Sequence, residues 1–460
     1  MNVVVFVVDD MGWADWTGGG STYYETPNLE RLAASGMTFT DAYAACPVCS
    51  PSRAALLTGK YPQRSGITDY IWSAEKKNDG ANQPQNWKRD TLLLPAPYED
   101  RLALEEKTLA EYLSDAGYAT FFAGKWHLGP EGFWPQDQGF DVNIGGWSQG
   151  GPYRGKQYFS PYDNPQMENG PDGEHLPDRL SFETAAFIRE HKDEPFLTYL
   201  SFYSVHTPLM APPELVEKYR DKRQQMRLTA AGEFDEKLEN GRQVRVVQRH
   251  AVYAGMIESM DRAVGKVLDE IEAQDLADRT LIVFTSDNGG LSTSEGSPTS
   301  NEPMRTGKGW MYEGGIRVPM IIRAPGLTGA GSSSHVPVSG VDLVPTVLAM
   351  AGLKTEVLGE FDGVDLTPAL KGEDLNRGEP IFWAYPHYGN QGGAPGAAVR
   401  DGDWKLVYWY EGDRFEIYNL ADDVGEDIDL SEKEPEVLER LKGELHAWLD
   451  EVDAISPTQR

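Results

Sequence analysis

Two cysteines, Cys46 and Cys49, lie three positions apart in the stretch ACPVCSPSRAALLTG and are the only thiols among 460 residues. This spacing could form a redox pair or half of a zinc site. A zinc site needs two further sulfur or imidazole ligands, and no third cysteine is present to contribute one. A redox pair of this type usually belongs to a much smaller domain. The pattern therefore favours chemistry by a single thiol.

Acidic and amide side chains follow two apolar runs. Asp9 and Asp10 follow the run that begins at Asn2, and Asp287 and Asn288 follow the run that begins at Leu281. Each pair taken alone is typical of a polar turn. Together, at the carboxyl ends of two strands, they predict a ligand-binding edge of an open α/β sheet. Carboxylate and amide oxygens suit calcium or magnesium better than zinc.

The elements that must position these residues alternate between strand and helix. Continuous apolar runs predict buried strands at 3–8, 196–202, 281–284 and 320–322. Helical spacing predicts helices at 27–35 and 252–271. The pattern indicates an α/β fold with a mostly parallel sheet sandwiched by helices. From about residue 378 short alternating segments predict a smaller antiparallel sheet, so we divide the chain into domains 1–375 and 376–460.

Composition limits the partners of the protein. Its 42 basic and 72 acidic residues give a formal net charge of -30, which disfavours nucleic acid. The most apolar early run covers residues 2–8, far too few to span a membrane. Such an acidic chain suits a saline or extracytoplasmic setting. We expect a periplasmic or secreted native protein whose signal peptide is absent from this chain, while a cytoplasmic location stays open.

The segment CSPSRAALLTG, Cys49 to Gly59, resembles the C-x-P-S-R-x-x-x-L-T-G signature of type I sulfatases in the alkaline phosphatase superfamily. Further blocks similar to that family occur in the same order along nearly the whole chain: VVDDMGW, GKWHLG, SFYSVHTP, TSDNGG and GKGWMYEGGIRVP. The resemblance implies an alkaline-phosphatase-like α/β domain followed by a smaller C-terminal α+β domain. It also implies a sulfatase that hydrolyses a sulfate monoester.

The resemblance implies a role for each matching residue. A maturation enzyme would oxidise Cys49 to formylglycine, whose hydrate attacks sulfur with one hydroxyl and expels sulfate through the other. One calcium ion would be held by Asp9, Asp10, Asp287, Asn288 and residue 49. The remaining catalytic roles are distributed as follows: Arg53 holds the nucleophile, Lys125 and Lys308 contact sulfate oxygens, His127 drives sulfate release, and His206 contacts sulfate and protonates the leaving group.

The substrate is less constrained. His387 lies in YPHYGNQGG, which resembles a loop that reaches the active site in carbohydrate-directed members, although a surface loop histidine fits equally well. Trp147 and Arg154 in one Gly-rich loop, and the loop 292–301, could line a sugar pocket or merely connect elements. We expect a sulfated carbohydrate, small or oligomeric, with an aryl sulfate also open. The sequence does not define the oligomeric state.

Two other functions remain as alternatives. A phosphodiesterase or phosphonate monoester hydrolase of the same superfamily would use similar ligands. Most phosphatases there bind a second metal with additional Asp and His residues, and the sequence shows no spare cluster of that kind. A catalytically inactive binding homologue is disfavoured because every residue of the catalytic set is present.

Overall fold

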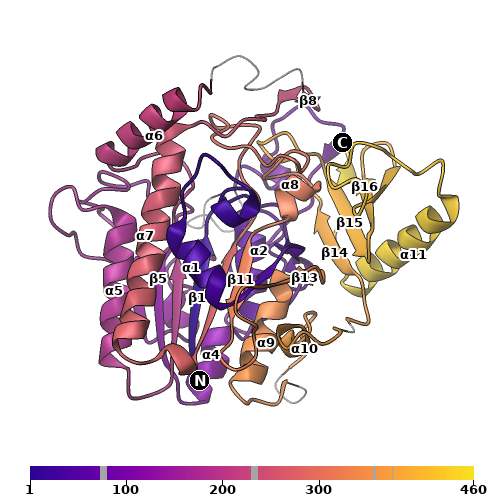
Figure 1. Ribbon diagram of the computed structural model, residues 1–460. Coiled ribbons are helices and arrows are strands. Elements are labelled where there is room, and N and C mark those ends of the chain that lie inside the picture. The colour runs from indigo at the N-terminus through magenta and orange to yellow at the C-terminus, as the bar shows by residue number, and fades with distance from the viewer. Residues whose placement is uncertain (73–79, 229–236, 356–358, 376) are drawn as a thin grey trace.

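The computed structural model describes residues 1–72, 80–228, 237–355, 359–375 and 377–460. Its larger part is built on an eight-stranded sheet with the strand order β12-β2-β11-β10-β1-β7-β5-β6 (Figure 1). The strands of this sheet are β1 Asn2–Val8, β2 Met37–Phe39, β5 Ala119–Gly124, β6 Val142–Ile144, β7 Phe196–Ser201, β10 Thr280–Ser286, β11 Met320–Arg323 and β12 Ser332–Ser334. The five neighbouring strands from β10 to β6 are parallel, and β11 pairs antiparallel with β10.

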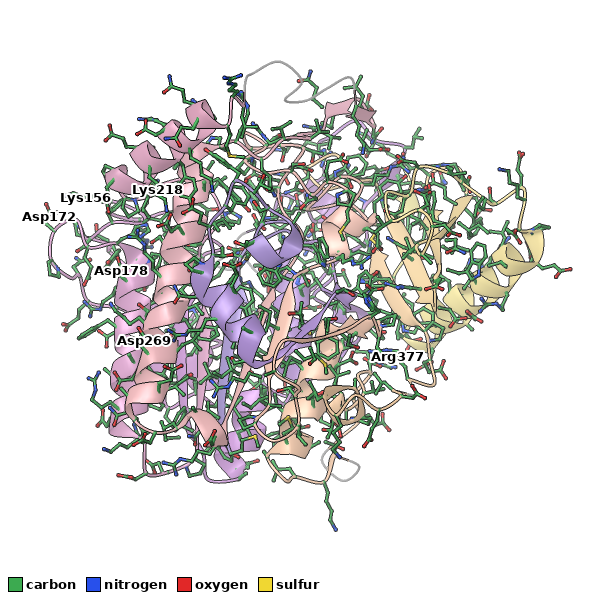
Figure 2. The ribbon with its side chains drawn as sticks, in the orientation of Figure 1. Lys156, Asp172, Asp178, Lys218, Asp269 and Arg377 are labelled. Atoms are coloured by element: carbon green, nitrogen blue, oxygen red, sulfur yellow. The ribbon has the colours of Figure 1, made fainter. Side chains whose placement is uncertain are left out.

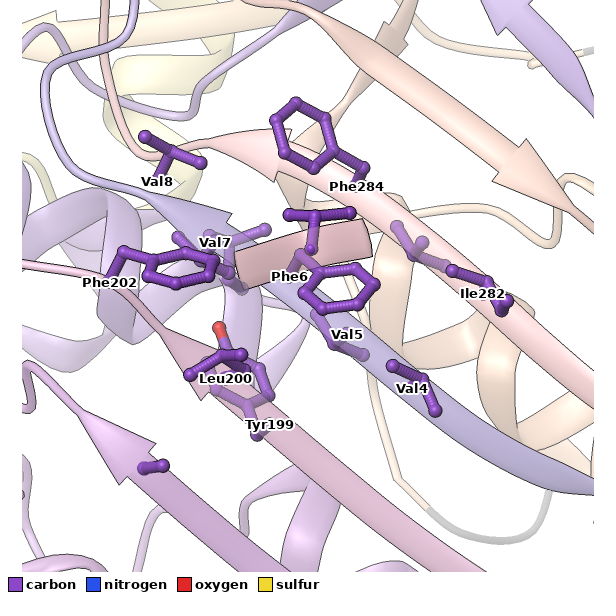
Figure 3. Close-up of a cluster of buried hydrophobic side chains, with 14 of the residues drawn as sticks. Val4, Val5, Phe6, Val7, Val8, Tyr199, Leu200, Phe202, Ile282 and Phe284 are labelled. Carbon is purple, nitrogen blue, oxygen red and sulfur yellow. The ribbon is translucent and has the colours of Figure 1, made fainter. Parts of the chain in front are cut away.

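Strand β1 lies at the centre of the sheet, and all seven of its residues are buried. Its side chains pack against those of β7 and β10, where Tyr199, Leu200, Ile282 and Phe284 lie around Val4 to Val8 (Figure 3). A strand buried on both faces is apolar without alternation. This explains why the continuous apolar run at residues 3–8 predicts a buried strand so clearly.

Helices cover both faces of the sheet (Figure 1). Helices α1, α5 and α6 pack against α7 on one side, while α2, α4 and α9 contact one another on the other side. The helices are α1 Pro27–Ser35, α2 Cys49–Thr58, α4 Leu109–Asp115, α5 Leu176–Glu190, α6 Pro213–Gln225, α7 Ala251–Ala273 and α9 Leu343–Met350. The predicted mostly parallel sheet sandwiched by helices is confirmed.

A second sheet follows in the C-terminal part of the chain. Strands β14, β15, β16 and β17 pair antiparallel in chain order, and α11 packs on one face with Trp448 stacked 4.9 Å from Phe382. These elements are β14 Ile381–Tyr385, β15 Gly396–Asp401, β16 Trp404–Trp409, β17 Arg414–Asn419 and α11 Pro435–Glu451. The predicted antiparallel sheet is confirmed. The domain boundary stays a prediction, and residue 376 lies outside the described residues.

The remaining strands and α-helices of the described residues are short. They are β3 Ala42–Tyr43, β4 Leu93–Leu94, β8 Leu238–Glu239, β9 Arg242–Gln243, β13 Val338–Ser339, β18 Thr458–Gln459, α3 Pro62–Ser65, α8 Glu313–Ile316 and α10 Thr367–Leu370. Within the described ranges, no helix is both long enough and apolar enough to cross a membrane. Charged side chains such as Asp178, Lys218 and Asp269 lie on the outer helices (Figure 2).

Buried charges join the two sheets. Lys405 on β16 is fully buried and donates to Glu313 Oε1 at 2.9 Å and to Glu426 Oε1 at 2.7 Å. Glu313 belongs to α8, and it also accepts from Tyr43 at 2.7 Å. Lys405 therefore forms ion pairs with two buried carboxylates. Burial raises the pKa of Glu426 to about 7, although Lys405 opposes the shift.

This shift predicts a specific pH dependence of stability. A carboxyl group whose folded-state pKa is raised stabilises the fold below its unfolded-state pKa, near 4.5, and this stabilisation is lost as pH rises through about 7. The unfolding free energy of the wild-type protein should therefore fall between these two pH values. In Glu426→Gln we expect this fall to be smaller by on the order of 3 kcal/mol. Urea unfolding at pH 5 and pH 8 measures the difference. The exposed control Glu432→Gln should keep the wild-type pH dependence, and equal pH dependence in all three proteins would contradict the assignment.

Candidate active site

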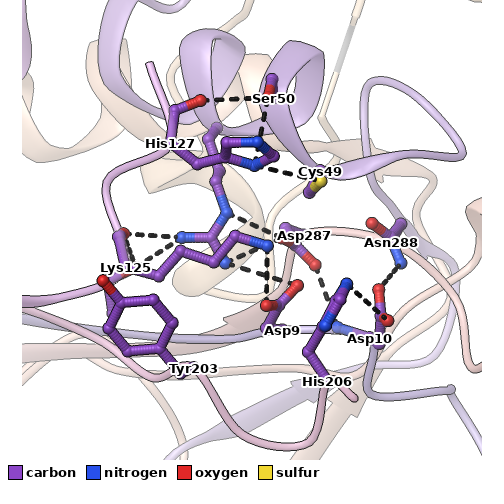
Figure 4. Close-up of polar contacts among 12 residues, drawn as sticks. Asp9, Asp10, Cys49, Ser50, Lys125, His127, Tyr203, His206, Asp287 and Asn288 are labelled. Carbon is purple, nitrogen blue, oxygen red and sulfur yellow. Dashed lines mark hydrogen bonds and ion pairs between the residues drawn. The ribbon is translucent and has the colours of Figure 1, made fainter. Parts of the chain in front are cut away.

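The central strands bring two pairs of polar residues together at their carboxyl ends. Val8 and Ser286 are register partners in the parallel pair β1 and β10, so the residues after them are neighbours. Asp10 N donates to Asp287 Oδ1 at 3.1 Å, and Asn288 Nδ2 donates to Asp10 Oδ1 at 2.8 Å. Figure 4 shows Asp9, Asp10, Asp287 and Asn288 grouped below Cys49 and His127. The structure thus gathers the predicted metal ligands at one edge of the sheet.

Each carboxylate of this group has a cationic partner from a different element. Lys125, which follows β5, donates to Asp9 Oδ2 at 2.7 Å. Lys308 lies 2.7 Å from Asp10 Oδ1. Arg53, one turn into α2, donates through Nε to Asp287 Oδ2 at 2.8 Å. The six side chains are buried, and their three negative and three positive charges balance.

The electrostatics of the carboxylates indicate a site suited to a cation. Burial raises the pKa of Asp9 well above its usual value, Lys125 opposes this shift, and the neighbouring Asp287 and Asp10 add to it. Burial also acts to raise the pKa of Asp10, but Lys308 and His206 outweigh it and hold the pKa below its usual range. A divalent cation among these carboxylates would relieve the repulsion at Asp9.

Two buried oxygen atoms of this group of carboxylate and amide side chains lack hydrogen-bond partners. Asp9 Oδ1 and Asn288 Oδ1 are inaccessible and accept no hydrogen bond. Buried acceptors without partners are costly and are usually satisfied by protein, water or an ion. With Asp10 they offer oxygen ligands of the kind that calcium and magnesium prefer. The two oxygens of the predicted ligand Asp287 already accept from Asp10 N and Arg53 Nε, and Asp287 lies outside the compact group of ligand atoms. Among the described His, Cys, Asp and Glu side chains, one group is close enough to share a metal, with ligand atoms within 4.8 Å of one another: Asp9, Asp10 and His206.

Cys49 is the first residue of α2, and His127 faces it. Cys49 Sγ lies 3.4 Å from His127 Nδ1, while His127 Nε2 lies 2.9 Å from the carbonyl oxygen of Ile71. A carbonyl can only accept, so Nε2 carries the proton and the neutral ring presents Nδ1 as an acceptor toward residue 49. Burial, followed by Lys125, lowers the pKa of His127 well below its usual value. His127 is therefore a neutral base aimed at Cys49.

The backbone around this pair is tightly packed. His127 and Asp10 have positive φ angles of 60° and 63°, which non-glycine residues adopt rarely and mostly where function demands it. A Cβ atom at Gly150 would lie 2.6 Å from His127 Cε1, so only glycine leaves room for the ring. The orientation of His127 is thus fixed from both sides.

The two cysteines are not arranged as a redox pair. Both are free and buried, and burial raises the pKa of each thiol, that of Cys46 well above its usual value. Redox-active cysteines have lowered pKa values and stabilised thiolates. Cys46 instead packs in an apolar cluster with Tyr43 and Val48.

A cavity of about 430 Å³ opens above the site. Its volume lies at the lower end of ligand-binding pockets. His206 borders it, with Nδ1 2.7 Å from the carbonyl oxygen of Thr207, so Nδ1 donates and Nε2 faces Asp10 at 3.8 Å. Further lining residues include Cys49, Tyr70, Trp72, His127, Ser148, Tyr153, Glu295, Lys308, Asn390 and Gln391.

The three residues predicted to contact substrate do not line this cavity. Trp147 is buried, and Arg154 covers its ring at 4.6 Å. His387 is 1% exposed, and its Nε2 lies 2.9 Å from Thr68 Oγ1. Tyr98 and Tyr385 pack against the His387 ring, and none of these three residues lines the cavity. Residues next to Trp147 and Arg154 in one loop, and residues near His387 in the other, line the cavity instead.

Sequence reasoning missed several lining residues. It named the loop 292–301 without singling out Glu295, and it named neither Tyr70, Trp72 nor Tyr153. Trp72 is 58% exposed and Tyr153 49% exposed. Large aromatic side chains in polar, glycine-rich loops were the available signal, but no periodic pattern shows which loop side chains point inward.

Comparison with known proteins agrees with the motifs. The family Sulfatase matches residues 1–353, and the family N-sulphoglucosamine sulphohydrolase, C-terminal, matches residues 305–453. The chain is 34% identical over 409 residues to N-acetylgalactosamine-6-sulfatase of Mus musculus, which covers 83% of this chain and 68% of that protein. It is 30% identical over 513 residues to arylsulfatase A of Homo sapiens, which covers 100% of this chain and 90% of that protein.

Solved structures extend this likeness to the fold. The crystal structure of Ps i-CgsB in complex with k-i-k-neocarrahexaose superimposes with a TM-score of 0.78 at 30% identity, covering 97% of this chain and 92% of that one. The phosphonate monoester hydrolase of Agrobacterium radiobacter shares the fold, with a TM-score of 0.65 at 20% identity over 98% of this chain and 95% of that one. Because the Sulfatase match covers most of its length, the chain belongs to the sulfatase family of the alkaline phosphatase superfamily.

Proposed function

We propose that this sulfatase hydrolyses a sulfate monoester of a carbohydrate, with residue 49 as a formylglycine nucleophile and one bound calcium ion. The observation that carries the proposal is the position of Cys49 and the base His127 in the wall of one cavity, with the carboxylates of Asp9 and Asp10 buried beside His206, which lines the same cavity. When present, the cation and the formylglycine hydrate supply an activated oxygen nucleophile and polarise the sulfate group.

The residues of this chain would divide the chemistry as follows. Lys125 and Lys308 place positive charge where the sulfate oxygens gain negative charge, while Arg53 fixes the Asp287 carboxylate and the base of α2. His127 Nδ1 takes a proton from residue 49, because its Nε2 proton is committed to Ile71. His206 would protonate the departing alcohol oxygen through Nε2 as an imidazolium, because Nδ1 keeps its proton on the Thr207 carbonyl. Burial lowers the pKa of the free ring to about 4, and a bound sulfate group would raise it.

Two kinds of observation support a carbohydrate as the alcohol. The exposed rings of Trp72 and Tyr153 border the cavity, and aromatic faces of this kind pack against the apolar faces of sugar rings. Relatives at 30% identity or more also act on or bind carbohydrates, as the names N-acetylgalactosamine-6-sulfatase and neocarrahexaose indicate. We further propose an extracytoplasmic location and an encounter with a formylglycine-generating enzyme before activity appears.

A panel of substrates tests the proposal. The matured protein should hydrolyse a sulfated mono- or oligosaccharide, and mass spectrometry should show a mass loss on the peptide containing Cys49 as thiol becomes aldehyde. Cys49→Ala should lose at least a thousandfold in kcat, since removing the nucleophile of a covalent mechanism costs about that much or more. The matched control Cys46→Ala should remain substantially active. Preference for a phosphonate monoester over every sulfate ester would overturn the proposal.

Metal binding provides a separate test that needs no turnover. Elemental analysis should find one divalent ion per chain, and added calcium should raise the melting temperature of the chelator-treated protein because it binds only the folded state. Asp10→Asn should abolish the calcium-dependent rise. The control Asp269→Asn, on the outer face of α7, should retain it. Two ions per chain, or zinc alone, would argue for the phosphatase alternative instead.

The fixed tautomer of His127 generates a kinetic prediction. His127→Ala should lower kcat by about 10² to 10⁴, the range for loss of a general base, with a much smaller change in KM. If His127 acts in sulfate release, rapid-mixing experiments should show a burst of alcohol, about one per active site, before the slow steady state. The control His191→Ala removes a partly exposed histidine that pairs with Glu194 and should behave as wild type. If His127→Ala lowered kcat/KM as much as kcat and showed no burst of alcohol, His127 would not be the base that drives sulfate release.

A further inference from the structure

Glu295 brings a negative charge into a cavity otherwise built to receive an anion. It lies in the loop between β10 and α8, and it lines the same cavity as Cys49, His206 and Lys308. Its φ angle of 52° lies in the left-handed region that non-glycine residues seldom adopt. Such conformations persist where surrounding contacts hold them, often at functional sites.

Two neutral side chains hold the carboxylate in place. Asn390 Nδ2 donates to Glu295 Oε1 at 2.8 Å, and Thr207 Oγ1 donates to Glu295 Oε2 at 3.1 Å. Thr207 directly follows His206, so Glu295 is fixed on the His206 side of the cavity. Within the described residues Glu295 makes no ion pair with Lys, Arg or His. Its carboxylate therefore lines the cavity without a cationic partner at ion-pair distance.

The position of this charge constrains the sugar rather than the reacting sulfate. The sulfate group is drawn toward Lys308, which lines the cavity and pairs with the buried carboxylate of Asp10. The sugar that carries it then lies in the same cavity, whose lining also includes Glu295 and the exposed rings of Trp72 and Tyr153. A hydroxyl or amide N–H of that sugar can donate to the carboxylate. A second sulfate or a carboxylate there would meet a like charge.

We propose that Glu295 makes the enzyme selective for a sugar that carries one sulfate and no second anionic group beside it. This inference rests on the proposed function, because it takes a sulfated sugar as the occupant. One like charge at a distance of several Å in a partly solvated pocket reduces affinity by about tenfold. Glu295 thus acts on the choice of substrate, while the residues on the cavity floor carry the chemistry.

The variant Glu295→Gln isolates the charge from the geometry. The amide oxygen of glutamine can still accept from Asn390, and its NH₂ group can donate to the Thr207 hydroxyl. Glu432→Gln is the matched control, because it makes the same chemical change at an exposed position of the C-terminal domain. It changes the net charge of -30 by the same single unit without touching the cavity.

Binding is measured by calorimetry in a Cys49→Ala background, so that turnover is not required. The probes are N-acetylgalactosamine 6-sulfate and N-acetylgalactosamine 4,6-disulfate, which differ by one sulfate. We expect the 6-sulfate to bind about tenfold more tightly, Glu295→Gln to reduce that ratio to near one, and Glu432→Gln to leave it unchanged. An unchanged ratio in Glu295→Gln, tighter binding of the disulfate to the parent protein, or no binding of either probe would overturn the inference.

Kinetics on the same two sugars separate this inference from the proposed function. With matured Cys49 present, the ratio of kcat/KM for the two sugars should follow the ratio of affinities. If selective binding is retained but neither sugar is hydrolysed, the proposed hydrolysis of such sugars fails and the role of Glu295 stands. If both sugars are hydrolysed at equal rates in every variant, the role of Glu295 fails and the proposed function stands.

Discussion

The compensation of buried charge at the carboxyl ends of β1 and β10 is the constraint on which the rest of the site depends. Three carboxylates this close together cannot remain ionised in a buried environment without partners. Lys125, Arg53 and Lys308 provide these partners, and each arrives from a different segment of the chain. Binding of a divalent cation would leave the cluster with excess positive charge, which suits an anionic substrate group. The same contacts thus stabilise the buried carboxylates of the free protein and would hold positive charge in place for an anionic substrate group.

The C-terminal sheet contributes to this site although it holds none of the residues proposed to act in catalysis. The segment after Lys308 runs into α8, where Glu313 pairs with the buried Lys405 of β16. The loop after β14 carries Asn390 and Gln391 to the cavity wall. Packing of the second sheet against α8 therefore holds the segment after Lys308 and one wall of the cavity in place together.

Sequence reasoning succeeded where one physical requirement dominates. Fully buried strands must be apolar, so β1 and β10 were visible, and the residues after them had to meet at one edge. It also named Cys49, His127 and Lys125 through motif resemblance. The substrate contacts of His387, Trp147 and Arg154 stay a prediction, and the cavity lining does not include these residues. Loop side chains follow no period, and their direction depends on packing partners elsewhere. The antiparallel pairing of β11 was likewise invisible, because its apolar run resembles that of a parallel strand.

The acidity of the whole chain and the cationic floor of the cavity act over different distances. Exposed charges separated by more than about 8 Å are largely screened at physiological ionic strength, so the net charge of -30 has little influence within the cavity. Buried groups such as Lys308 are screened far less, and they act on an anion only after it has entered. Glu295 is more exposed than Lys308, so its charge is screened more strongly than that of a buried group. It is nevertheless close enough to Lys308 for both charges to act on one bound substrate molecule. Attraction for an anionic group is therefore strongest beside Lys308, whereas a second anionic group near Glu295 would meet a like charge.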